Sequence, residues 1–314
     1  MLKKVQLLTA GELFLFAVCA AILLQMKSVA LRSLFKMKLT MKTNLLPVLF
    51  FTCITIIAAS CNTPRYIYSP SAHNVPVLTK KGDSKVGAVY STNAVGQETK
   101  NAVEIDNRSR GYDLQGAVAI TNNFAIQAAH AYRWEKTEGG PDSVTIKYKR
   151  NLTEVGLGYY LPVNDKGNTF FQVFAGAGLG RFSFTDVDKT GSYYHQANIT
   201  KIYLQPAILF KSKGSFTTSV SVRFGGINYS KIKTNYSASQ LSNYYLEDLT
   251  GRSKWFFEPA SVSSFGLKGV PGLRFEVQGG LSFLMARNYV DYRKFNFSIG
   301  TWIDMGKLFI KNKE

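Results

Sequence analysis

The stretch that decides the fold is Leu273–Met285, which reads LRFEVQGGLSFLM. From Leu273 onward, every second residue is apolar or small, whereas most residues between them, beginning with Arg274 and Glu276, are polar or glycine. Successive side chains of a β-strand point to opposite faces, so this alternation predicts a strand with one apolar and one polar environment.

The same two-residue period recurs along the chain from Ser84 onward. In the stretch 169–184, one face is apolar and the other holds a glutamine, a phenylalanine and three glycines. The pattern predicts strands near 84–92, 111–121, 124–136, 144–163, 169–184, 198–212, 215–232, 253–267, 273–286 and 295–307. We therefore expect about ten strands, with eight or twelve as alternatives because the first is weakly patterned.

Two all-β architectures could accommodate these strands. A soluble sandwich buries its apolar faces, whereas a membrane barrel turns them toward lipid and keeps its polar faces inside. Glycine recurs on the polar faces, as a narrow interior requires, and aromatic residues gather at strand ends, as in the two girdles of membrane barrels. These pairs and runs are Tyr132-Trp134, Phe182-Phe184, Trp255–Phe257 and Tyr289-Tyr292. We expect an antiparallel transmembrane β-barrel over residues 84–309.

The lengths of the connections predict an orientation. The expected short connections are 122–123, 164–168, 212–214 and 268–272, and the longer ones between them are 92–111, 185–200 and 233–253. Outer-membrane barrels have short periplasmic turns and long outer loops, so we expect the longer set to face outward. An even strand count returns both ends of the barrel to the periplasmic side.

Cys61 follows a stretch with the order of a bacterial signal peptide. Residues 41–60 begin with Met41 and a lysine, continue through the apolar run Leu45–Ile57 and end in small residues. The segment resembles a lipobox, which implies cleavage before Cys61, lipidation of its thiol and an anchor in the inner leaflet. The alternative is cleavage by the general signal peptidase, which would leave Cys61 as a free thiol.

The remaining segments outside the barrel are short. Residues 1–40 hold a second apolar run, Leu13–Leu24, which is shorter than the roughly 20 residues of a spanning helix. We interpret them as the product of an upstream start, or alternatively as an inner-membrane anchor. Residues 61–83 contain three prolines, and we expect a loose periplasmic tether there. Residues 310–314 form a tail.

Charge and cysteine usage limit the partners. The formal net charge is +18, but the lysines and arginines are scattered. This favours acidic surfaces such as lipopolysaccharide and the lipid bilayer, and not nucleic acid. Of the three cysteines, Cys19 and Cys53 precede Cys61, so the mature chain would have no disulfide framework.

Two phrases in the strands suggest a family. YLQPAILFK at Tyr203–Lys211 and FEPA at Phe257–Ala260, together with the strand pattern of residues 84–309, resemble small β-barrel proteins of Gram-negative outer membranes. More narrowly, they resemble an uncharacterised lipidated subgroup. The resemblance implies a fold and an outer-membrane location, and it implies no known activity.

The candidate chemistry is sparse. Among the three histidines, His73, His130 and His195, only the last lies near carboxylates in an expected outer loop, beside Asp186 and Asp188. A His–Asp pair there could act as a base with an orienting carboxylate, as in ten-stranded surface proteases. We nevertheless assign no catalytic, cofactor-binding or metal-binding residue and expect no enzyme and no cofactor. The only modification site that we predict is lipidation of Cys61.

The expected role follows from the interior and the loops. Several charged residues fall on the inward face: Arg133, Glu135, Glu154, Lys201, Arg223, Glu258, Arg274, Glu276 and Asp304. They could line a pore, but we favour a packed set of ion pairs because the interior of a small barrel is largely filled. The loop 233–253, rich in tyrosine, serine and asparagine, could bind a surface or envelope protein. We expect a structural or binding role at the cell envelope, with a narrow channel as the alternative and a surface hydrolase as the third possibility.

Overall fold

The computed structural model describes residues 63–93, 97–100, 103–139, 144–189, 191–212, 215–267, 270, 272–285 and 289–305. All of them belong to one compact unit. The expected leader, Cys61 and the tail 310–314 lie outside the described residues.

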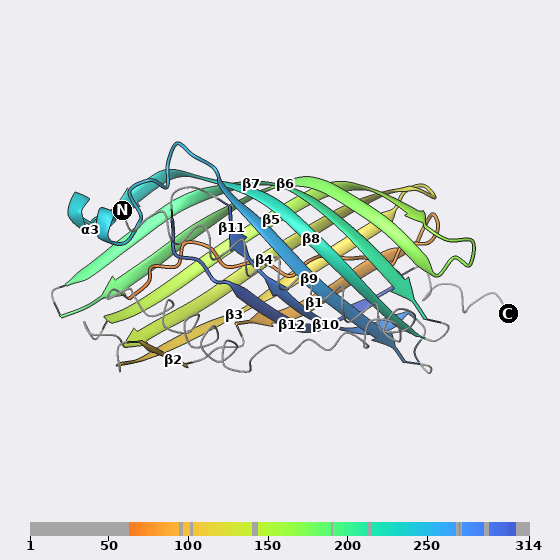
Figure 1. Ribbon diagram of the computed structural model, residues 1–314, viewed down its shortest axis with the longest axis horizontal. Coiled ribbons are helices and arrows are strands. Elements are labelled where there is room, and N and C mark those ends of the chain that lie inside the picture. Colours follow the sequence, from red (N-terminus) through yellow and green to blue (C-terminus); the bar gives the residue numbers. More distant parts are fainter. Residues whose placement is uncertain are drawn as a thin grey trace, which may run out of the picture. The chain divides into compact units, whose positions relative to one another are not determined.

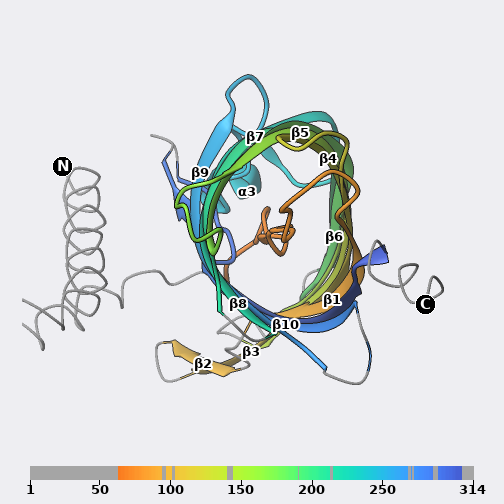
Figure 2. The same ribbon diagram turned by 90° about the vertical axis from the view of Figure 1, so that its right-hand side faces the viewer.

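Ten antiparallel strands close into a ring (Figures 1 and 2). In ring order they are β1 (Ser84–Thr92), β3 (Val103–Ala119), β4 (Phe124–Gly139), β5 (Val144–Pro162), β6 (Thr169–Val187), β7 (Ser192–Lys211), β8 (Phe216–Thr234), β9 (Lys254–Gly266), β10 (Leu273–Leu281) and β12 (Phe295–Ile303). The ring closes because β1 pairs with both β3 and β12. Two short strands extend it: β2 (Gln97–Lys100) pairs with β3, and β11 (Phe283–Leu284) pairs with β9. The predicted ten-stranded barrel is confirmed.

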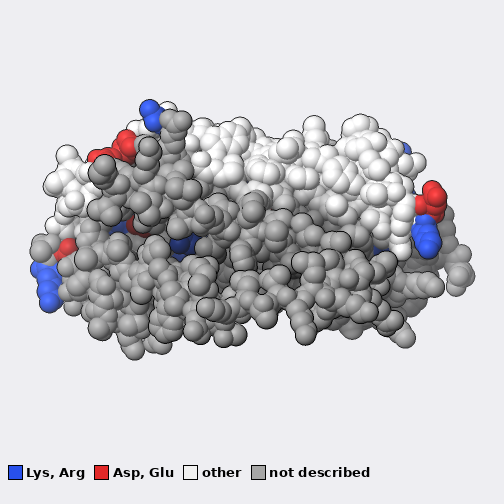
Figure 3. Space-filling model, viewed as in Figure 1, with Lys and Arg blue, Asp and Glu red and all other residues white. Residues whose placement is uncertain are grey.

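The outer surface of the barrel is apolar through its middle. Leu157 is 67% exposed and Leu179 is 69% exposed, although both lie within regular, fully paired strands. In Figure 3, the described surface along the upper side of the barrel is uncharged between the charged side chains near its two ends. An apolar surface this large is stable when lipid covers it, so the barrel is built to span a membrane.

This apolar band predicts where a charge is costly. Replacing Leu157 by Arg should destabilise the barrel in a bilayer by about 2–4 kcal/mol, because the side chain would meet hydrocarbon near the midplane. Val187 is also exposed but ends β6. Val187→Arg should therefore change the free energy of unfolding much less. Urea unfolding in lipid vesicles measures the free energy of unfolding of both variants. Equal losses would show that Leu157 lies no nearer the bilayer midplane than Val187.

The two ends of the barrel differ. The connections 120–123, 163–168, 212–215 and 267–272 lie at one end, here called the turn end. The strand ends that β1 and β3, β4 and β5, β6 and β7, β8 and β9, and β10 and β12 share along the chain lie at the other, the loop end. The loop 235–253 contains the one-turn helix α3 (Ala238–Asn243). The expected short connections are confirmed.

Two expected long connections are wrong in length. Much of 185–200 is strand, because β6 and β7 stay paired as far as Val187 and Ser192. Similarly, β3 already begins at Val103. The strands extend beyond the apolar outer band because their inward-facing side chains remain buried there. Phe182 and Phe184 are each 1% exposed. The prediction that these two rings belong to a membrane girdle is therefore wrong.

The segment expected to be a periplasmic tether lies inside the barrel. We call residues 63–83 the lumen segment. Viewed along the barrel, its orange trace runs within the ring of strands (Figure 2). Ile67, His73 and Leu78 are at most 3% exposed. The prediction of a loose tether is thus wrong for the described residues, because inward-facing wall side chains bind the polar groups that water would otherwise solvate.

The lumen segment crosses the barrel from the loop end to the turn end. Arg65 donates from Nε to Asp186 Oδ2, near the loop end of β6, at 2.8 Å. At the opposite end, the backbone N of Gly82 donates to the carbonyl of Ala119, the last residue of β3, at 2.9 Å. The chain then enters β1 at the turn end.

Glycines on the inward face make room for aromatic rings from neighbouring strands. Gly158 pairs with Phe174, and a Cβ added there would lie 2.3 Å from the ring. Gly176 pairs with Tyr203, and its Cβ would lie 2.7 Å from the phenol. The predicted use of glycine in a crowded interior is confirmed.

Gly158→Ala should therefore destabilise the barrel by about 1–3 kcal/mol, because Phe174, which is fully buried, has to move. Gly279 on β10 is the matched control, since a Cβ there meets nothing within 4 Å. Gly279→Ala should leave stability nearly unchanged. Urea midpoints of the two variants against wild type check this, and a Gly158→Ala midpoint equal to wild type would contradict the packing.

Candidate functional site

The lumen is held together by buried ion pairs. Glu135 on β4 accepts hydrogen bonds from two arginines: Arg150 on β5 binds one carboxylate oxygen, and Nε of Arg293 lies 2.9 Å from the other. All three side chains are nearly inaccessible. Breaking this triad would leave a buried charge without a partner, which is among the most costly changes in a protein.

Further pairs lie in the same interior. Glu154 lies 3.2 Å from Nζ of Lys201 and 3.9 Å from Nη1 of Arg223. Arg133 binds Asp113 at 2.7 Å, and Lys85 binds Glu276 at 2.8 Å. Every charged residue predicted to face inward is buried: Arg133, Glu135, Glu154, Lys201, Arg223, Glu258, Arg274, Glu276 and Asp304. The predicted ion pairing is confirmed for Arg133, Glu135, Glu154, Lys201, Arg223 and Glu276, although sequence reasoning missed their partners Lys85, Asp113, Arg150 and Arg293.

Aromatic side chains fill the loop end of the lumen. Ile67 of the lumen segment belongs to a buried apolar cluster with Phe182, Phe184 and Leu246. Arg65 stacks over the ring of Tyr244, with 3.9 Å between its guanidinium carbon and the ring centroid. The described lumen segment is therefore packed into the wall like a core element.

The His195–Asp186 pair considered from the sequence, but not assigned a catalytic role, does not form. The imidazole of His195 stacks on Phe184 at a centroid distance of 5.5 Å, because the register of β6 and β7 places these two residues opposite each other. Within the described residues, neither ring nitrogen of His195 has a hydrogen-bond partner. Asp186 instead accepts from Arg65 and from the Tyr236 hydroxyl. Asp188 accepts from the backbone N of Gly191 within the connecting turn.

Tyr236 lies just beyond β8 and closes this corner of the loop end. Burial, followed by the hydrogen bond to Asp186, raises the pKa of Tyr236 above its ordinary value. Its hydroxyl therefore keeps its proton and can continue to donate to Asp186. The carboxylate is thus fully engaged in holding the lumen segment and is a poor partner for a catalytic histidine.

His73 forms a contact that the sequence did not suggest. Its Nδ1 lies 2.7 Å from Oγ of Ser221 on β8, and both side chains are buried. A serine and a histidine at this distance could form a nucleophile–base pair. Both side chains lie deep in the filled lumen, where a substrate from solution has no access to them. The contact therefore serves to fix the lumen segment on the wall.

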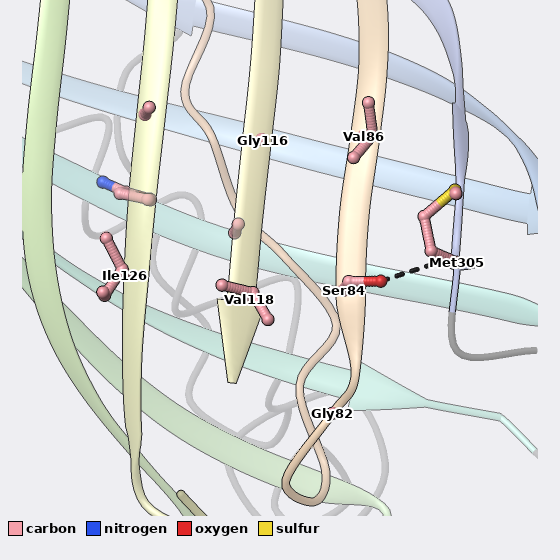
Figure 4. A pocket seen from close by; sticks show the side chains of 10 residues that line it. Gly82, Ser84, Val86, Gly116, Val118, Ile126 and Met305 are labelled. Atoms are coloured by element: carbon pink, nitrogen blue, oxygen red, sulfur yellow. Dashed lines mark hydrogen bonds between the residues drawn. The ribbon is translucent and has the colours of Figure 1, made fainter. Parts of the chain in front are cut away.

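A shallow apolar hollow of about 540 Å³ lies at the turn end of β1, β3 and β4 (Figure 4). Val86, Val118 and Ile126 line it and are at least 41% exposed, as expected for the lipid-facing surface. A hydrogen bond from the backbone N of Met305 to Oγ of Ser84, 3.1 Å long, ties one edge. The hollow lies outside the ion-paired lumen.

The described residues hold no group of three or more histidine, cysteine or carboxylate side chains arranged to bind a metal. In the same part of the chain, no helix has both the length and the apolar character needed to cross a membrane. Cys61, the predicted lipidation site, lies outside the described residues.

Comparison of the coordinates with solved structures gives barrels of low sequence identity. The translocator domain of the autotransporter NalP from Neisseria meningitidis is 13% identical, with 71% of this chain and 88% of that chain covered and a TM-score of 0.42. The outer membrane protease OmpT from Escherichia coli is 10% identical, with 71% and 95% covered and a TM-score of 0.39. The outer membrane protein OprD from Pseudomonas aeruginosa is 7% identical, with 73% and 97% covered and a TM-score of 0.27.

Two of the three, OmpT and OprD, are outer-membrane proteins. The barrel of this chain itself is given by its own closed strand pairing. No family model matches the sequence, and no curated protein matches it. At this similarity the neighbours assign no activity to this chain.

Proposed function

We propose that this protein is a bacterial outer-membrane β-barrel lipoprotein with a structural or binding role at the cell envelope. The observation that carries the proposal is the filled lumen: the buried lumen segment and the ion pairs around it occupy the space that a channel would need. The apolar outer band supports insertion in a membrane. The narrow-channel alternative is disfavoured for the same reason, and the His–Asp geometry does not support a hydrolase.

Planar-bilayer recording tests the closed lumen. Purified wild-type protein should insert without producing steady conductance steps, because the buried lumen segment and the ion pairs around it fill the described interior. Steps that change in size in an Arg223→Ala variant would support the channel instead, since Arg223 is buried in the wall of the lumen.

The lipid anchor remains part of the proposal, but we now propose it at the loop end of the barrel and not at the turn end. Thr63 lies close to the loop end, because Nη1 of Arg65 donates to its carbonyl oxygen while Nε of the same side chain binds Asp186. Cys61 is only two residues away, a reach of at most about 7 Å. An acylated Cys61 would therefore be carried at the loop end, and not at the turn end that the strand count alone suggested.

Mass and labelling measurements separate the two parts of this claim. The intact mass of the membrane-extracted protein should match a chain that begins at an acylated Cys61. An epitope inserted after Asn62 should be labelled on intact cells together with one in residues 235–242, whereas one between Lys166 and Gly167 should need permeabilised cells. If the Asn62 epitope, like the Lys166 epitope, were labelled only in permeabilised cells, the placement of Cys61 at the loop end would be refuted. An unmodified Cys61 would refute the lipid anchor.

The loop end also supports a binding surface. Tyr245 is 45% exposed and Tyr289 is 50% exposed, and their rings meet edge to face at 5.2 Å. Exposed tyrosines offer broad contact area at small entropic cost. We propose that an envelope or surface protein binds here, beside lipopolysaccharide, whose phosphates suit the positive net charge.

A further inference from the structure

We propose that the lumen is a binding site for an extended polypeptide, and that residues 64–74 are the ligand it carries in cis. The inference goes beyond the envelope role, since a barrel could be closed by side chains alone. It rests on how the wall contacts the segment: inward-facing polar side chains bind the peptide groups of the segment from several strands.

The clearest contact is a paired one. Gln278 on β10 accepts from the backbone N of His73 at 2.6 Å and donates to the backbone O of His73 at 3.1 Å. One side-chain amide thus satisfies both peptide groups of one residue, as a neighbouring strand would. Gln205 on β7 donates to the backbone O of Asn74 at 2.9 Å. Both glutamines are at most 2% exposed.

Other groups repeat this contact along the segment. They donate to its carbonyl oxygens at 2.8–3.3 Å: Tyr148 to Pro64, Tyr229 to Ile67, the backbone N of Arg293 to Tyr68, Arg133 to Pro70 and Gln115 to Ala72. Buried peptide groups need partners, and each unmet one is costly. The wall therefore replaces the ladder that a paired strand would supply.

The chemistry of the segment suits such a site. Pro64, Pro70 and Pro76 fix the backbone at extended angles and remove donors, so the segment cannot join the sheet as a regular strand. Among the described residues, the segment forms one isolated β-bridge, which joins Tyr68 and Tyr292. Proline-rich extended segments lose little entropy on binding, which makes them good ligands for grooves that read the backbone.

Three side chains fix the register. Arg65 binds Asp186, the Tyr68 hydroxyl donates to Glu258 at 2.8 Å, and His73 meets Ser221. The ligand class is therefore an extended, proline-containing polypeptide with a basic residue, an aromatic hydroxyl three residues later and an imidazole eight residues after the first.

The segment joins β1 through an exposed turn, which makes the site testable. Lys80, Lys81 and Gly82 are exposed, and the carboxylate of Asp83 holds the turn by accepting from the backbone N of Thr79 at 2.7 Å. A specific protease site inserted between Lys81 and Gly82 would leave the segment bound only by non-covalent contacts after cleavage. The same site between Lys166 and Gly167 is the control for cutting as such.

We expect the cut segment to co-elute with the barrel in size-exclusion chromatography. It should exchange slowly with a fluorescent synthetic peptide of residues 62–81. Gln278→Glu removes the donor to His73, so the labelled peptide should dissociate about tenfold faster or more. Gln127→Glu is the matched control, because Gln127 is equally buried and donates to Tyr203 within the wall.

Gln205→Glu provides a second variant if Gln278→Glu does not fold, and the expected effect has the same sign. The inference is overturned if the cut segment leaves the wild-type barrel at once, or if the peptide dissociates equally fast from the glutamine variants and the Gln127 control. Either result would leave the envelope role in place, since that role is tested by recordings on the uncut protein.

Discussion

Glu135→Ala is expected to destabilise the barrel by about 3–5 kcal/mol, because it leaves Arg150 and Arg293 buried without their shared carboxylate. The loss should appear as a lower urea midpoint in lipid vesicles. It should also appear as an earlier loss of the compact band when unheated samples are run on SDS gels after warming.

The same strand offers a control for this prediction. Glu138 on β4 pairs with Lys136 at 2.5 Å, but the two side chains are 39% and 44% exposed. Glu138→Ala should cost less than about 1 kcal/mol, as exposed pairs usually do. If both variants lost the same stability, the triad would not be the buried anchor of the lumen that its geometry indicates.

Replacing residues 64–78 with a Gly-Ser repeat of equal length should turn a silent barrel into a conducting one. The repeat keeps the chain length but removes Arg65, Ile67, Tyr68, His73 and Leu78, whose side chains hold the segment to the wall. A flexible polar chain would leave water between the wall charges. Planar-bilayer recordings should then show steps that wild type lacks.

A folded control is needed for the conductance result. The same kind of repeat in place of α3, residues 238–243, keeps every residue of the lumen segment and removes Leu241, a partly buried neighbour of the cluster around Ile67. It should stay silent. A folded 64–78 variant that also stays silent would mean that the wall side chains alone close the lumen.

Much of the fold was predictable because lipid-facing and lumen-facing residues alternate along each strand, and this alternation is visible in the sequence. β1 lies where the alternation predicted it, at Ser84–Thr92, and β5 and β6 begin at the expected residues. The role of the inward glycines was predictable for the same reason. Glycines that recur at every second position indicate a strand face with no room for side chains. These features depend on local alternation, which a single sequence displays.

The lumen segment was not predictable in this way. It has no period, and its prolines and polar residues look like those of a solvated linker. Its burial depends on wall groups far away in sequence, such as Gln278 for His73. The only local hint is the set of apolar residues among the prolines, including Ile67 and Leu78. The sequence also could not decide whether His195 and Asp186 meet, because the register between β6 and β7 pairs His195 with Phe184 and Asp186 with Tyr193.

The path of the lumen segment limits the order in which the molecule can be assembled. A closed ring with a chain through its centre cannot be made by finishing the ring first, unless the free end is later pulled through a packed interior. The seam between β1 and β12 runs from Val86–Ile303 to Thr92–Phe297. It joins the first ring strand to the last, so it can form only after the whole chain is present. If Cys61 already carries acyl chains, these bulky groups must lie outside the ring when the β1–β12 pairing forms. The strands must therefore close around the lumen segment, and the segment does not thread into a finished barrel.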